Sequence, residues 1–226
     1  MKSNISNGKI IFLAALFLSS VYLSAQDGSE LITAVVYQDL DKIKEVLKAG
    51  VDVNYQDENY GNTALIISCQ YNFVDIAKYL IEAGADISAK ATTGHTPLMA
   101  AASASEELVD LLIAKGADAT VKLEDGTSAF TLSITGILMD RIGFKNAKTL
   151  LEKGADVDEK QVSGEAEGYT CLMMAARNQR PDIVNFLVEN GADVNAKAGN
   201  GDTPLSLAEK EGDQEMVALL KKYGAK

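Results

Sequence analysis

The chain of 226 residues contains no tryptophan, one histidine, two cysteines and three prolines. A single histidine, His95, leaves little material for a multi-histidine metal site or for histidine-based catalysis. Basic residues are also scarce, since 21 lysines and arginines face 32 acidic residues and give a formal net charge of −11. Such an acidic protein repels phosphate backbones, so the composition argues against nucleic-acid binding.

Sequence motifs for catalysis and for phosphate binding are missing as well. The chain has no GxxxxGK[ST] phosphate loop, no nucleophile elbow and no HExxH zinc motif. We therefore expect no catalytic residues, no cofactor and no bound metal, and we expect that the protein is not an enzyme.

The one long apolar run stands at the N-terminus. IIFLAALFLSSVYL, residues 10–23, follows Lys2 and Lys9 and precedes the small residue Ala25. This order is typical of a secretory signal peptide, and the run is shorter than the ~20 residues that a membrane-spanning helix needs. We expect residues 1–25 to be cleaved off and the protein to be exported, either periplasmic or secreted. The alternative is an uncleaved anchor that displays the remaining chain from a membrane.

The rest of the chain repeats itself. GHTPLMAAA, residues 94–102, returns as GDTPLSLA, residues 201–208, and the glycine that opens each such phrase recurs after 33, 32, 42 and 33 residues. A second marker, the glycine of GAD-like signals, recurs after 34, 32, 38, 37 and 33 residues. In period and in residues the pattern resembles the ankyrin repeat.

Each part of the repeat has a physical role. The threonines suit the N-cap of a first helix, Pro97 and Pro204 suit its first position, and the GAD-like glycines suit the end of a second helix. The sequence thus predicts a mainly α fold, an ankyrin-repeat α-solenoid of about six helix-turn-helix units with β-hairpin finger loops. After the signal peptide, 1–25, the repeat domain spans 26–226, with units at about 29–57, 58–90, 91–122, 123–160, 161–197 and 198–226. The threonines expected at the N-caps of the first helices are Thr63, Thr96, Thr170 and Thr203.

Two features depart from the pattern. Unit four is five residues longer from Gly126 to Gly154 than unit two is from Gly61 to Gly84, and we expect the extra residues between its two helices. Cys69 and Cys171 belong to units two and five, too far apart in a stack for the α-carbon separation of about 7 Å that a disulfide allows. We therefore predict two unpaired thiols.

The resemblance also implies where a partner binds, because such proteins contact partners through the finger tips and the exposed face of the first helices. The leading hypothesis is an exported, monomeric, non-enzymatic module that binds an unknown protein and, once the signal is cleaved, no membrane. The alternative is a ligand-binding or enzymatic protein that uses the unit-four insertion, with Asp140, Arg141, Glu165 and Glu167 as acid and base groups. The partner-binding positions in this sequence are Asn59, Tyr60, Asn62, Tyr71, His95, Ser103, Tyr169, Arg177, Asn178 and Asp202.

Overall fold

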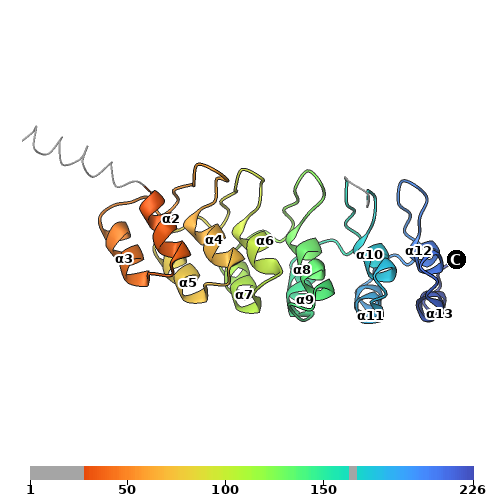
Figure 1. Cartoon of the computed structure of the whole chain (residues 1–226). Coiled ribbons are helices and arrows are strands. Elements are labelled where there is room, and N and C mark those ends of the chain that lie inside the picture. Colours follow the sequence, from red (N-terminus) through yellow and green to blue (C-terminus); the bar gives the residue numbers. More distant parts are fainter. Residues whose placement is uncertain (1–27, 163–166) are drawn as a thin grey trace, which may run out of the picture.

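A computed structural model describes residues 28–162 and 167–226, and the predicted signal peptide lies outside them. In the described part the helices form antiparallel pairs that stack side by side in one elongated row (Figure 1). The solenoid predicted from the repeat is confirmed. The six pairs are α2 (Ser29–Val36) with α3 (Leu40–Lys48), α4 (Ala64–Gln70) with α5 (Val74–Glu82), α6 (Pro97–Ala102) with α7 (Glu106–Ala114), α8 (Ala129–Leu138) with α9 (Lys145–Glu152), α10 (Cys171–Arg177) with α11 (Pro181–Glu189), and α12 (Pro204–Lys210) with α13 (Gln214–Lys222).

The predicted threonine caps open the first helices of units two, three, five and six. Each hydroxyl accepts the backbone N–H three residues ahead, as Thr63 does from Ile66 at 3.2 Å and Thr203 from Ser206 at 3.1 Å. This satisfies one of the N–H groups that lack a partner at a helix start. Ser128 performs the same task in unit four, accepting from Thr131. The first helices of units two to six therefore begin with side-chain caps.

Between successive pairs, the finger loops in the described part of the chain project to the same side of the stack (Figure 1). Single antiparallel bridges close three of them, at Gln56–Thr63, Lys122–Ser128 and Lys160–Thr170. Between a second helix and its finger, Gly84 takes a φ of +94°, a conformation that side-chain-bearing residues rarely adopt. The fingers are thus minimal hairpins whose direction is fixed at both ends.

The hydrophobic core runs the length of the stack, because each unit covers the apolar face of its neighbour. Its largest fully buried side chains include Leu65, Leu98, Phe130 and Leu150. Cys69 and Cys171 are also buried and form no disulfide, which confirms the prediction of unpaired thiols.

Both thiols are expected to resist chemical labelling while the protein is folded. Burial raises the pKa of the Cys69 thiol to about 12, and burial, with smaller contributions from Glu159 and Asp158, raises that of Cys171. Because the thiolate is the reactive form, a disulfide reagent such as Ellman's at pH 8 should label neither cysteine in buffer and both in denaturant. Fast labelling of one thiol in buffer would contradict the described packing.

Unit four differs from the prediction in where its extra residues lie. The first helix, α8, has ten residues where α4 has seven, and the connection to α9 spans 139–144, so the expectation that all five fall between the helices is wrong. The sequence of α8, AFTLSITGIL, is mostly apolar. The helix therefore continues about one turn longer than α4, and its residues Ile134 and Ile137 are buried in the core. Arg180 then donates to the carbonyls of Ile137 and Leu138 at 3.0 and 3.1 Å and caps the longer helix.

Candidate functional site

A groove of about 600 Å³ lies between the fingers and the first helices of the N-terminal four units. Its floor is apolar and comes from successive first helices: Ile32 on α2, Ile67 on α4, Ala100 on α6 and Leu132 on α8. Residues at equivalent positions of stacked units therefore form one continuous strip. Such a strip suits an apolar surface of another molecule.

Large side chains on the sides of this groove remain exposed. Tyr60 on the first finger is 65% exposed, Tyr71 at the end of α4 is 60% exposed and Val36 at the end of α2 is 52% exposed. Tyr71 is held by a stacked contact with Phe73, with ring centroids 5.8 Å apart. Aromatic side chains fixed in this way are the common anchors of protein interfaces.

Hydrogen bonds within the fingers fix their shape. The Asp57 carboxylate accepts the backbone N–H groups of Asn59, Tyr60 and Asn62 at 2.9, 2.7 and 2.9 Å. On the next finger the Nδ1 atom of His95 lies 2.9 Å from the Thr93 hydroxyl. The groove wall is therefore organised before any partner arrives, which lowers the entropic cost of association.

Six of the ten predicted partner-binding residues line this groove, and four do not. Arg177 and Asn178 are exposed at the end of α10, outside the groove. Tyr169 and Asp202 are only 5% and 8% exposed, so the expectation that they face a partner is wrong. The six that line the groove are Asn59, Tyr60, Asn62, Tyr71, His95 and Ser103.

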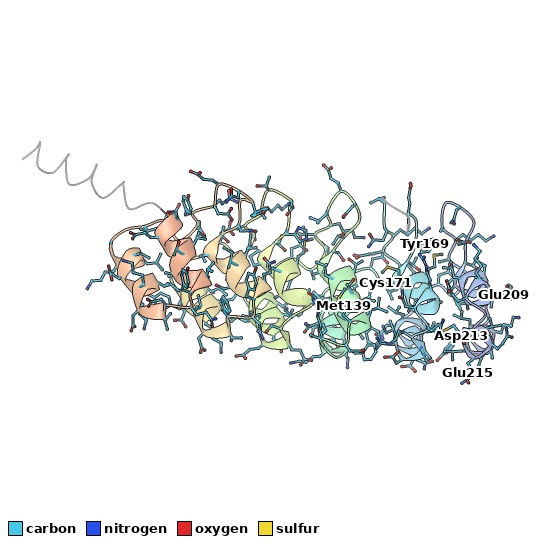
Figure 2. All side chains as sticks on the ribbon, viewed as in Figure 1. Met139, Tyr169, Cys171, Glu209, Asp213 and Glu215 are labelled. Carbon is cyan, nitrogen blue, oxygen red and sulfur yellow. The ribbon has the colours of Figure 1, made fainter. Side chains whose placement is uncertain are left out.

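Tyr169 is buried in a small apolar cluster between units five and six. Its ring packs with Met173, Ala196, Ala198 and Leu207, and its hydroxyl donates to the Asp202 carboxylate at 2.7 Å. Figure 2 labels Tyr169 beside Cys171, near the start of α10. Tyr169, the unit-five equivalent of His95, is thus buried rather than exposed to a partner.

The stability contributed by the contact between Tyr169 and Asp202 depends on pH. Lys210, then Tyr169 and Asn200, lower the pKa of the Asp202 carboxyl from 3.8 to about 2. A carboxyl whose pKa is lower in the folded state stabilises the fold above its ordinary pKa, and the contribution disappears as the pH falls through the folded value.

We therefore expect Asp202→Asn to lower the free energy of unfolding at pH 7, with the difference from wild type shrinking between about pH 4 and pH 2. Urea unfolding at a series of pH values measures it. Glu82→Gln, at an exposed carboxylate on α5, is the control and should show no such convergence. A constant difference down to pH 2 would contradict the role of the Asp202 charge.

Sequence reasoning missed most of the groove floor. Val36 and Gln70 line the groove but were not among the predicted partner-binding positions. Ser103, the residue of unit three that is equivalent to Gln70, was among them. Met99, expected as a core residue, is buried and also borders the groove. The usable signal was the spacing: Gln70 and Ser103 each stand seven residues after a capping threonine, so the repeat itself marks equivalent surface positions.

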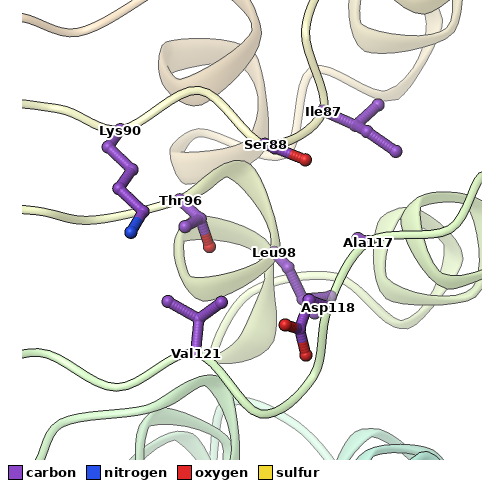
Figure 3. Close-up of a pocket in the computed structure, with 8 residues that line it drawn as sticks. All are labelled: Ile87, Ser88, Lys90, Thr96, Leu98, Ala117, Asp118 and Val121. Atoms are coloured by element: carbon purple, nitrogen blue, oxygen red, sulfur yellow. The ribbon is translucent and has the colours of Figure 1, made fainter.

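A second, smaller cavity of about 160 Å³ lies where the loops after α5 and α7 meet the start of α6 (Figure 3). Ile87, Leu98 and Val121 form its apolar part, with Lys90 and Asp118 at the edge. The Asp118 carboxylate already accepts from the backbone N–H and hydroxyl of Thr120. We interpret this cavity as part of the joint between units two and three.

Three of the four groups proposed for a catalytic insertion lie in the described part of the chain. Asp140 pairs with Arg180 at 3.2 Å, Arg141 and Glu167 are exposed, and Glu165 lies outside the described residues. Over 28–162 and 167–226 no group of three or more His, Cys, Asp or Glu side chains is placed to hold a metal ion. None of the helices in these ranges is long and apolar enough to span a bilayer.

The stacked pairs, capped starts and projecting fingers define a repeat protein with an open groove on one side. A family model for ankyrin repeats in three copies matches residues 31–134 and 138–226. The chain belongs to the ankyrin repeat family.

Comparisons with individual proteins agree with this assignment. The solved ankyrin repeat domain of human ASB11 superposes with a TM-score of 0.71 at 29% identity, covering 87% of this chain and 84% of that domain. The human neurogenic locus notch homolog protein 1 is 32% identical over 172 residues, 74% of this chain and 6% of that protein. The human transient receptor potential cation channel subfamily A member 1 is 29% identical over 163 residues, 72% of this chain and 14% of that protein.

These curated relatives are much longer than the segment they share with this chain, which spans 6% and 14% of their lengths. One is a notch homolog and another a cation channel. The shared part is therefore the repeat array. An ankyrin repeat domain is in general a protein–protein interaction module.

Proposed function

We propose that this protein is a non-enzymatic interaction module that binds a partner protein in the groove of its N-terminal four units. The observation that carries the proposal is the exposure of Val36, Tyr60 and Tyr71 along one apolar strip. Exposed large apolar side chains gathered on a rigid surface are typical of an interaction site. The fixed fingers supply the preorganisation that makes such a surface efficient.

The test combines capture with mutation of the groove. A photoreactive amino acid at position 71 should crosslink to a partner, whereas the same group at position 139, at the end of α8, serves as the matched exposed control. With the partner identified, Tyr60→Ser/Tyr71→Ser should weaken binding about 30-fold or more, because truncating an anchor side chain costs 2 kcal/mol or more. Arg177→Ser should leave the affinity unchanged. Equal affinities for wild type and the double variant would refute the proposal.

We also propose export, with cleavage after Ala25, from the order of basic start, apolar run and small residue. Intact-mass measurement of the protein from its producing cells should show a chain that begins at Gln26. A mass that includes residues 1–25 would favour the anchored alternative.

A further inference from the structure

We infer that the segment bound in the groove presents large apolar side chains next to lysine or arginine. This inference rests on the proposed function and adds the chemistry of the partner. It is carried by three independent observations: the charge around the groove, the faces of its tyrosines and the apolar floor between them.

The charge of the molecule is concentrated where the groove lies. Residues 49–114 contain nine acidic and two basic residues, a net charge of −7 out of the −11 of the whole chain. The two basic residues are Lys78, which pairs with Glu107, and Lys90, which borders the small cavity of Figure 3. No lysine or arginine lines the groove, and its one charged lining residue is Asp57. A basic partner is therefore attracted to this end of the stack.

The exposed tyrosines favour the same partner. An aromatic ring carries negative charge on its faces, so a lysine or arginine lying over Tyr60 or Tyr71 is stabilised by a cation–π interaction. The exposed carboxylate of Glu58 stands on the same finger as Tyr60 and makes no hydrogen bond or ion pair in the described part of the chain. This carboxylate is free to form an ion pair with the same lysine or arginine of the partner.

The apolar floor determines which side chain of the partner binds next to the lysine or arginine. The floor is uncharged: Ile32 and Leu132 are half-buried and Ile67 is buried. It therefore favours a large apolar side chain, such as leucine, methionine or phenylalanine, over a polar one. In unit six the equivalent floor position is Leu207, which is buried in one cluster with Tyr169. We therefore assign the recognition chemistry to the N-terminal four units.

The experiment uses the protein as it is produced and a phage-displayed library of random twelve-residue peptides. Selection should enrich peptides with a large apolar residue beside lysine or arginine. For a synthetic peptide of that composition, Glu58→Lys should weaken binding at least fivefold at low salt, and Glu152→Lys, on the exposed end of α9, should change it little. Raising the salt should reduce the difference between wild type and Glu58→Lys.

The outcomes separate the inference from the function on which it rests. Enrichment of acidic or uncharged peptides whose binding is lost in Tyr60→Ser/Tyr71→Ser overturns the partner chemistry and leaves the groove function intact. Enriched peptides that bind this double variant as well as wild type overturn both. A dimer of the chain that dissociates in the double variant overturns the inference by making a second copy the occupant, and so does a selection without enrichment.

Discussion

Replacing Phe130 with alanine is expected to lower the free energy of unfolding by about 3–5 kcal/mol, the range for removing a buried phenylalanine side chain. Phe130 is fully buried at the start of α8. This helix packs on α6 of unit three, on α9 of its own unit and on both helices of unit five. A cavity at this point therefore weakens the contacts of α8 with four neighbouring helices at once.

The same change is expected to separate the unfolding of the two ends of the stack. The contact of α8 with α10 is less extensive than its contact with α6, so the joint between units four and five is already the weaker one. In a repeat array each unit is stabilised by its neighbours, and weakening a joint divides the array into two cooperative blocks. Urea unfolding of Phe130→Ala followed by circular dichroism should show a broadened or two-step transition.

Met139→Ala is the matched control, since Met139 stands at the other end of the same helix and is exposed (Figure 2). Its loss should change stability by less than 1 kcal/mol. If Phe130→Ala cost no more than Met139→Ala, the core of unit four would not have the described packing.

The repeat architecture is predictable from the sequence because its signals are local. A threonine cap, a proline at the first helical position and a glycine after the second helix each act within a few residues, and the period of about 33 residues multiplies them. Unit four shows the limit of this logic. Ser128 replaced the threonine without loss of the cap, but the point at which α8 ends depends on Arg180, 43 residues away from Ile137.

The candidate site was predictable only in part, since exposure depends on the next unit. His95 and Tyr169 both stand between a finger glycine and a capping threonine, and each suggests a surface side chain by its place in the repeat. Tyr169 turns inward for two reasons. The equivalent position one unit later is Asp202, whose carboxylate accepts a hydrogen bond from the Tyr169 hydroxyl. The small residues Ala196 and Ala198 also leave room for the ring. A contact between residues of two units cannot be predicted from the sequence pattern of one repeat alone.

The buried carboxylate of Glu159 is a second feature of this kind. It occupies the position held by Ala89 in unit two and by Ala196 in unit five, yet it is only 2% exposed. Its Oε2 atom accepts the Ser128 hydroxyl, and its Oε1 atom lies 3.3 Å from the Lys122 ammonium. A buried carboxylate needs such partners, because an unpaired charge in the interior is costly.

Ser128→Ala is accordingly expected to destabilise the protein by about 3 kcal/mol, more than the loss of a helix cap alone. The hydroxyl both accepts the N–H of Thr131 and donates to Glu159. Loss of the cap costs about 1 kcal/mol, and loss of a hydrogen bond to a buried charge costs about 1.5–3 kcal/mol. Thr203→Ala, which removes a cap with no carboxylate behind it, should cost only about 1 kcal/mol.

A double-mutant cycle isolates the contribution of the carboxylate. In a Glu159→Ala background, Ser128→Ala should cost about 1 kcal/mol, since only the cap remains to be lost. Glu159→Ala alone should cost about 1–3 kcal/mol, because it leaves the buried Ser128 hydroxyl without an acceptor, although alanine itself fits the equivalent position in two other units. Urea unfolding of the four proteins measures the cycle. An equal cost of Ser128→Ala in both backgrounds would show that the serine acts as a cap alone and that Glu159 is held by Lys122 without it.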